Sequence, residues 1–215
     1  MREGYGVMTL VVALTLVGCS ARAPDEQVPP SHSVGSAADA EPDVEPDVEL
    51  REDLLRRAAL DQAVRGGPPP DGMTADEVPR IDEVDASNQA RIAEVLDEHG
   101  WPGWSLVGRR GSTAAWTIVQ HADLDPELQR RGLELLQAAV EAGDASEGDL
   151  AYLTDRVRVA DGEPQLYGTQ WSLTRSGRWI PRTPIEDRAD VDERRESAGL
   201  DPLAEYVAEL RSTAP

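Results

Sequence analysis

The chain has 215 residues, of which 41 are acidic and 21 are basic, and this length allows one domain of ordinary size plus tails. A hydrophobic fraction of 40% and a formal charge of −20 argue against a multi-span membrane protein. The same charge argues against a protein that holds nucleic acid through a basic surface, so no nucleic acid is expected as a partner.

Residues 1–18 are predicted to form a bacterial signal peptide. Arg2 precedes an apolar stretch, Val7 to Val17, that is too short to span a bilayer as a stable helix. The stretch ends in Leu16-Val17-Gly18-Cys19, which resembles a lipobox, the cleavage motif whose cysteine is diacylated and becomes the mature N-terminus. Cys19 is therefore expected to be a lipid anchor in the cell envelope, outside the cytoplasm and in the outer membrane if the cell has two. The alternative is an uncleaved membrane segment with an incidental cysteine.

Residues 19–49 are predicted to be a disordered linker. They are rich in Pro, Ala, Ser, Asp and Glu, contain the repeat EPDVEPDVE, and have too few large apolar residues to form a core. Repulsion between the acidic side chains should keep the linker extended between the membrane and a domain over residues 50–215. The alternative is that this acidic stretch recognises a partner or binds a divalent cation.

The first half of that domain contains residues typical of helix starts and helix ends. A helix from Leu50 is expected to end at Gly66-Gly67, and a second, capped by Asp85, is expected to end at Gly100. Residues 103–111 look like a turn-rich connection, and residues 114–121 like a short, buried helix.

The second half adds further helices and one hairpin. Asp125-Pro126 is a strong helix start, and Ser146 is expected to cap the next helix, whose pattern fades at Asp161. A β-hairpin is predicted over residues 164–182, with helices over 187–198 and after Asp201-Pro202. The fold class is therefore mainly α with a small β-hairpin (α+β), in a single helical domain of five to seven helices.

His121 is the first candidate for chemistry. It follows Gln120, a candidate ligand-binding residue, at the end of the buried helix, where the helix C-terminus favours a protonated imidazole. A carboxylate from Asp123, Asp125 or Asp155 could orient the ring, and the catalytic candidates are His121 as general acid or base and Asp123 as the orienting group. The alternative is a structural histidine that ties the helix end to its neighbour.

Two further stretches carry polar residues that packing alone does not require. Asp155 and Arg156 offer a binding group for an anion, although the arginine could equally form a surface ion pair. In the predicted strand, amide, hydroxyl and phenol groups surround Gly168, which suits either a ligand-facing surface or a packed hairpin whose amides bond to the backbone. The ligand-binding candidates of this strand are Gln165, Tyr167, Thr169 and Gln170.

No cofactor or metal is expected. The chain has no phosphate-cradling glycine loop, no G-x-S-x-G, no paired C-x-x-C and no H-E-x-x-H. His121 and Asp123 point to different sides of a helix, and His99 lies on another predicted helix, so this pair is a poor metal site.

Several motifs together resemble one bacterial protein family, which is known only as a domain of unknown function. The resemblance covers about residues 50–211, and it implies no catalytic assignment. Its motifs are DQAVR at 61–65, HGWP at 99–102, QHAD at 120–123, LTDRV at 153–157 and QLYGTQ at 165–170.

Three functions remain open from the sequence. The first is a membrane-anchored lipoprotein whose domain binds a small polar ligand or an envelope component. The second is a hydrolase or transferase in which His121 acts as general acid or base and Arg156 holds an anionic group. The third is a structural or assembly factor.

Overall fold

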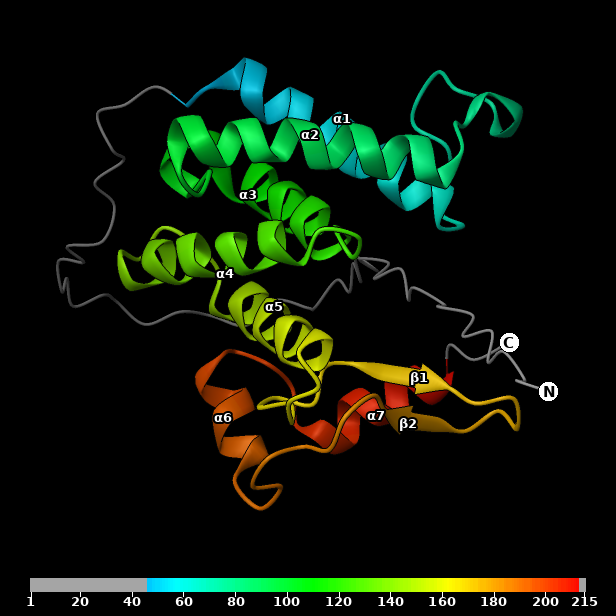
Figure 1. Ribbon diagram of the computed structural model, residues 1–215, viewed down its shortest axis with the longest axis vertical. Helices are drawn as coiled ribbons and strands as arrows, with labels where there is room; N and C mark the ends of the chain where they lie inside the picture. The colour runs from blue at the N-terminus through cyan, green and yellow to red at the C-terminus, as the bar shows by residue number, and fades with distance from the viewer. Residues whose placement is uncertain (1–45, 213–215) are drawn as a thin grey trace, which may run out of the picture.

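The computed structural model describes residues 46–212, so the predicted signal peptide, Cys19 and the linker up to residue 45 lie outside the described residues. The described part contains seven α-helices, a short 3-10 helix and one two-stranded antiparallel hairpin (Figure 1). This confirms the predicted mainly α fold with a small hairpin. The elements are α1 (Val48–Val64), η1 (Ala75–Glu77), α2 (Ile81–His99), α3 (Trp104–Gln120), α4 (Pro126–Glu141), α5 (Glu147–Ala160), β1 (Trp171–Leu173), β2 (Trp179–Pro181), α6 (Val191–Ser197) and α7 (Leu203–Ser212).

Local side-chain caps set the starts of α1, α4 and α5. The Asp125 carboxylate accepts a hydrogen bond from the Leu128 N–H at 3.0 Å, and the Ser146 hydroxyl accepts one from the Asp149 N–H at 3.2 Å. Asp47 caps α1 in the same way, so this helix begins at Val48, two residues before the predicted domain boundary. Side-chain caps satisfy N–H groups that have no partner within the helix, which is why these starts are readable from the sequence.

The predicted start of α2 is wrong. The helix begins at Ile81 after an extended Arg80, and Asp85 lies within it. The Asp85 carboxylate pairs instead with Arg65 of α1 at 2.7 Å, so a tertiary contact uses the side chain that looked like a cap.

The predicted connection over residues 103–111 is also wrong, because α3 already begins at Trp104. The helix is kinked at Gly108, where φ is 70° and ψ is 167°. Side chains with a Cβ rarely adopt this backbone conformation, so a glycine lets the chain turn between two helical segments that pack as one element.

The hairpin is shorter than predicted. Its strands pair Trp171 with Pro181 and Leu173 with Trp179, and its turn follows residues 174–177 as expected. The preceding residues 165–170 form an irregular loop, not a strand, because the buried Asp155 collects their N–H groups. The helix predicted over 187–198 is limited to α6, which begins after Asp187 with its φ of 37°.

The main core lies between α1, α2, α3, α4 and α5, and a smaller cluster holds the C-terminal elements. Leu54, Ile92, Val119 and Leu153 are completely buried in the main core. The smaller cluster is formed by Val191, Leu203 and Val207, with Trp171, Ile185 and Tyr206 packed against it. Figure 1 shows α1 and α2 at one end of the molecule and the hairpin with α6 and α7 at the other.

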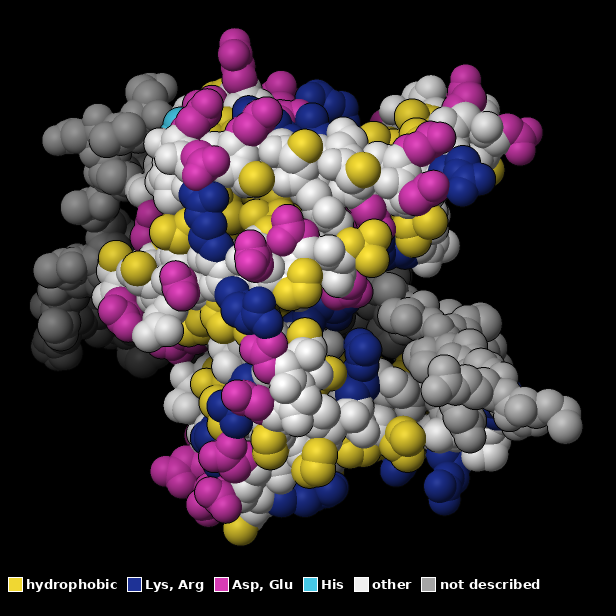
Figure 2. Space-filling view, viewed as in Figure 1, with side chains coloured by type: hydrophobic (Ala, Val, Ile, Leu, Met, Phe, Trp, Pro, Cys, Tyr) yellow, Lys and Arg dark blue, Asp and Glu magenta, His cyan; other side chains and the backbone are white. Residues whose placement is uncertain are grey.

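Acidic side chains are spread over the outer surfaces of the helices on the face shown in Figure 2. None of the helices in the described range is long and apolar enough to cross a membrane.

Candidate functional site

His121 is the C-cap residue of α3, and its side chain is held by Asp61 from the last part of α1. The imidazole Nδ1 lies 2.6 Å from the Asp61 Oδ2, and the two residues are 6% and 1% exposed. Among the described residues, Nε2 of this ring has no hydrogen-bond partner. An aspartate on one ring nitrogen fixes the orientation and tautomer of the imidazole and leaves the other nitrogen available.

The negative charge of Asp61 is balanced by Arg65. The Arg65 Nη1 donates to the Asp61 Oδ1 at 2.8 Å, one helical turn along α1, and the Gln62 amide donates to Oδ2 at 3.0 Å. Arg65 also donates to Asp85 of α2 at 2.7 Å, and its side chain is only 9% exposed. A buried carboxylate requires such partners, because an isolated buried charge is strongly unfavourable.

Asp123 and Arg156 form a two-point ion pair close to His121. The Arg156 Nε and Nη2 donate to the two carboxylate oxygens at 3.0 and 2.8 Å. Burial alone would raise the pKa of Asp123, but the charge and hydrogen bonds of Arg156, with smaller contributions from Gln129 and His121, lower it below its ordinary value. The Asp123 side chain is 51% exposed, so the pair reaches the solvent.

Two glutamines connect this pair to its surroundings. The Gln170 Oε1 accepts from the Arg156 Nη1 at 3.3 Å, which ties the 165–170 loop to the ion pair. The Gln129 amide donates to the Gln120 carbonyl at 2.9 Å and to Asp123 at 3.2 Å. The Gln120 side-chain Oε1 is buried and has no partner in the described part of the chain.

Asp155 organises the 165–170 loop. Its two oxygens accept hydrogen bonds from the N–H groups of Leu166, Tyr167 and Thr169 and from the Thr169 hydroxyl, at 2.7 to 3.3 Å. Two carboxylate oxygens have about four acceptor sites, so these contacts occupy them. The buried Asp155 carboxylate therefore fixes the backbone conformation of the loop.

The side chains of Gln165 and Thr169 also face the protein interior. The Gln165 amide donates to the carbonyls of Gln170 and Thr183 at 3.0 Å each, and its Oε1 accepts from the Gln170 N–H at 2.7 Å. The Thr169 hydroxyl accepts from the Gln170 amide at 3.1 Å. These contacts orient Gln170 toward Arg156.

Tyr167 and Gly168 complete the loop. The Tyr167 carbonyl accepts from the buried Arg195 at 2.8 Å, and burial together with the charge of Asp155 raises the pKa of the Tyr167 phenol. Gly168 has a φ of 68°, and a Cβ there would lie 2.7 Å from Ile185. Only glycine therefore fits this tight turn without strain.

The structure brings part of the predicted set together. His121, Asp123, Arg156 and Gln170, together with Gln120, form what we call the polar cluster at the end of α3. The cluster is held in place by the 165–170 loop, which is bonded internally through Asp155, Gln165 and Thr169. The assignment of Asp123 as the group that orients His121 is wrong, because Asp61 takes that role and Asp123 pairs with Arg156.

Asp61 and Arg65 were missed as site residues. They are sixty and fifty-six positions before His121 in the chain, and no local pattern relates them to it. The only available signal was the DQAVR motif, which begins with Asp61 and ends with Arg65, and whose spacing puts both side chains on one helical face.

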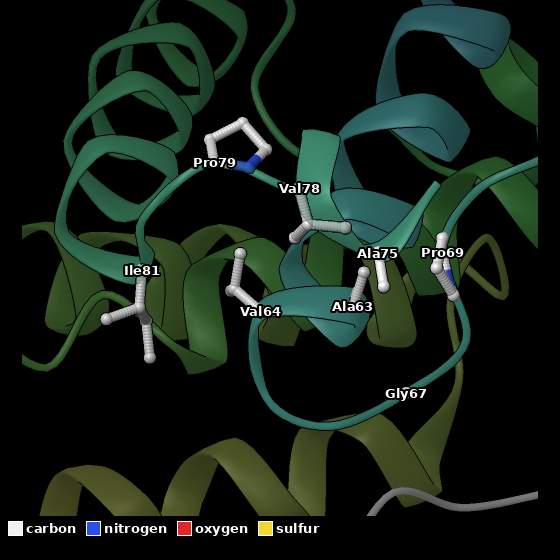
Figure 3. A pocket seen from close by; sticks show the side chains of 8 residues that line it. All are labelled: Ala63, Val64, Gly67, Pro69, Ala75, Val78, Pro79 and Ile81. Atoms are coloured by element: carbon white, nitrogen blue, oxygen red, sulfur yellow. The ribbon is translucent and has the colours of Figure 1, made fainter. Parts of the chain in front are cut away.

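The polar cluster offers proton transfer and hydrogen bonding. No group of three or more His, Cys, Asp or Glu residues within residues 46–212 is arranged to hold a metal ion. A separate hollow of about 350 Å³ lies at the turn between α1 and α2 (Figure 3), and only Ala, Val, Gly, Pro and Ile residues line it. That hollow has no charged side chain to orient a polar ligand.

Residues 46–214 match the family of unknown function DUF6624, and the chain belongs to this family. The match confirms the resemblance to a family known only as a domain of unknown function. Comparisons with curated proteins and with solved structures found no match.

Proposed function

We propose that this domain binds a small polar ligand of the cell envelope at the polar cluster, and that a lipid on Cys19 tethers it to the membrane. The ligand site is inferred from the hydrogen bonding of the two ring nitrogens of His121. Asp61 engages its Nδ1, while Nε2 has no partner among the described residues. An imidazole held at Nδ1 can accept a hydrogen bond from a bound molecule at Nε2, and the preceding residue, Gln120, has a buried Oε1 without a partner in the described part of the chain.

The surrounding charges suit a ligand that donates hydrogen bonds. With Nδ1 protonated toward Asp61, Nε2 is an acceptor, and the half-exposed Asp123 carboxylate is a second acceptor nearby. Arg156 is already engaged by Asp123 and Gln170, so its role is to hold these acceptors in place. Hydroxyl and ammonium groups of sugars, peptidoglycan fragments or amino-acid derivatives fit this arrangement.

A thermal-shift screen of the full chain tests the site. The probes are sugars, nucleotides, peptidoglycan fragments and amino-acid derivatives, each applied to the wild type, to Arg156→Gln and to Arg130→Gln. Arg130 is the matched control because it forms an Arg–Asp pair with Asp161 and makes no hydrogen bond to a residue of the polar cluster. A ligand at a hundredfold excess over Kd stabilises by about 2.7 kcal/mol, which is a rise of about 5 to 10 °C in Tm.

We expect at least one class of probe to raise the Tm of the wild type and of Arg130→Gln but not of Arg156→Gln. No shift with any probe in any of the three proteins would contradict the ligand site and favour a structural or assembly role.

A second function, general acid–base catalysis in a hydrolase or transferase, is favoured by the 2.6 Å contact between Asp61 and His121. An imidazole oriented in this way can take a proton from water or a substrate hydroxyl through Nε2. For such an enzyme the wild type turns over the bound probe, and His121→Gln removes this turnover. A binding protein shows no turnover in the wild type at all.

The lipid anchor is tested by mass spectrometry of the protein extracted from membranes. We expect an N-terminal peptide that begins at a diacylated Cys19. A mature protein that begins at Met1 with a free thiol would contradict the anchor.

A further inference from the structure

A second polar site lies at the opposite end of the molecule from α1 and α2, where the hairpin meets the end of α7. A hollow of about 440 Å³ is lined there by Gly177, Arg178, Trp179, Ile180 and Arg211. We propose that this hollow, called the hairpin hollow, binds an oxyanion such as the phosphate of a small molecule or of a lipid headgroup.

The first argument is the charge of the hairpin. Residues 164–184 contain three arginines and no acidic residue, although the chain as a whole carries a charge of −20. Figure 2 shows few acidic side chains on the lower right of the molecule, below the hairpin, in contrast to the lower left. An isolated basic patch on an acidic protein attracts anions selectively to that place.

The second argument is that the two arginines of the hollow are uncompensated. Neither Arg178 nor Arg211 has a carboxylate partner among the described residues, whereas most other arginines of the domain do. Two free guanidinium groups on one hollow are suited to the oxygens of phosphate, which they bind in pairs of parallel hydrogen bonds.

The third argument is an orphaned donor. The Trp179 side chain is 9% exposed, and its indole Nε1 is buried without an acceptor in the described part of the chain. A buried N–H without a partner is rare in folded proteins. An oxyanion in the hairpin hollow would supply the missing acceptor while its charge is balanced by Arg178 and Arg211.

The indole N–H signal provides the test. Proton–nitrogen correlation spectra of the ¹⁵N-labelled full chain with Cys19→Ser are recorded during titration with sodium phosphate, with sodium chloride adjusted to keep the ionic strength constant. The Trp179 signal is identified as the one missing in Trp179→Phe, or by backbone-linked assignment if that variant does not fold. We expect this signal to move with phosphate and to remain in place with chloride alone.

Three arginine variants separate the site from general charge effects. Arg178→Gln and Arg211→Gln should each raise the Kd for phosphate about tenfold, which is the usual effect of losing one hydrogen bond to a charged group. Arg175→Gln removes the same charge from the same turn but does not line the hollow, and it should leave the Kd within about twofold.

Sedimentation with vesicles distinguishes the two sources of phosphate. Binding to phosphatidylglycerol but not to phosphatidylcholine vesicles, with the same dependence on Arg178 and Arg211, identifies a lipid headgroup. Binding of free phosphate without vesicle binding identifies a small molecule. An immobile Trp179 signal throughout the phosphate titration, or equal losses in Arg175→Gln and Arg178→Gln, would overturn the proposal.

Discussion

At the scale of single residues, two buried aspartates decide the geometry of the polar cluster. Asp61 is 1% exposed and fixes His121, and Asp155 is completely buried and fixes the 165–170 loop. Neither of these two contacts joins residues that are close in the sequence. The sequence therefore does not show which of the 41 acidic residues are buried. This is why Asp155 looked like a ligand-binding residue and why Asp61 was missed.

Asp155→Asn should destabilise the fold markedly. The amide keeps one oxygen but turns an NH₂ group toward main-chain N–H groups, which leaves buried donors without an acceptor. We expect a loss of about 3 kcal/mol in the free energy of unfolding, measured by urea denaturation. Asp82→Asn, at an exposed ion pair, should change it far less, and an equal effect of both variants would contradict the assigned role.

Asp149 should make stability depend on pH. Burial raises the pKa of this carboxyl to about 6. A folded-state pKa above the unfolded value means that the associated stability is present below about pH 4 and is lost as the pH rises through 6. Asp149→Asn should therefore raise the free energy of unfolding at pH 8 by about 1 to 2 kcal/mol and change it little at pH 4.

Asp161 provides the opposite control for this prediction. Hydrogen bonding to Arg130 lowers the pKa of Asp161, so Asp161→Asn should reduce stability at pH 8 and not increase it. Chemical denaturation of both variants at the two pH values checks the signs. A stabilising effect of Asp149→Asn that is the same at pH 4 and pH 8 would contradict the shifted pKa.

At the scale of elements, the parts that could be predicted are those with local causes. Asp125-Pro126 and Ser146 cap their helices where the sequence indicates, because the capping partner lies three residues away. The sequence around Gly108 suggested a connection because the glycine there has a positive φ that kinks α3. The loop at 165–170 suggested a strand, but its shape depends on contacts with the distant Asp155. Local propensity yields to tertiary contacts in such segments.

The packing of α3 against α4 depends on Gly132. A Cβ at this position would lie 2.6 Å from the Val119 Cγ1, and both residues belong to tightly packed helices. Gly132→Ala should cost about 1 to 3 kcal/mol, because the two helices must move apart. Gly148→Ala is the control, since its Cβ would meet its nearest neighbour at 3.4 Å and alanine favours a helix.

Thermal unfolding of the two alanine variants measures this difference. We expect a lower Tm for Gly132→Ala and an unchanged or slightly higher Tm for Gly148→Ala. The reverse order would show that α3 and α4 do not approach as closely as described.

At the scale of the whole molecule, the net charge of −20 sets the balance of long-range electrostatics. Self-repulsion of like charges destabilises the compact state, and salt screens it. Raising NaCl from 10 to 200 mM at pH 7.5 should increase the Tm of the full chain by about 2 to 4 °C. The increase should disappear near the isoelectric point of about 4.4, and a decrease at pH 7.5 would mean that attractive ion pairs dominate.

The two proposed sites are built from different residues. The polar cluster collects residues from the end of α3, from α5 and from the loop before the hairpin, while the hairpin hollow is lined by residues 177–180 and Arg211 of α7. Binding at the two places should therefore be separable by variants of Arg156 and of Arg178.

The protonation of the two ring nitrogens of His121 tests most directly the claim that Nε2 accepts a hydrogen bond from a ligand. Long-range ¹H–¹⁵N spectra of the labelled full chain at pH 8, where an ordinary histidine is neutral, report which ring nitrogen carries the proton. The account predicts that Nδ1 is protonated toward Asp61 and that Nε2 is a bare acceptor, and that Asp61→Asn changes this pattern. A wild-type ring protonated on Nε2 would contradict it, because that nitrogen would then be no acceptor for a ligand or a proton.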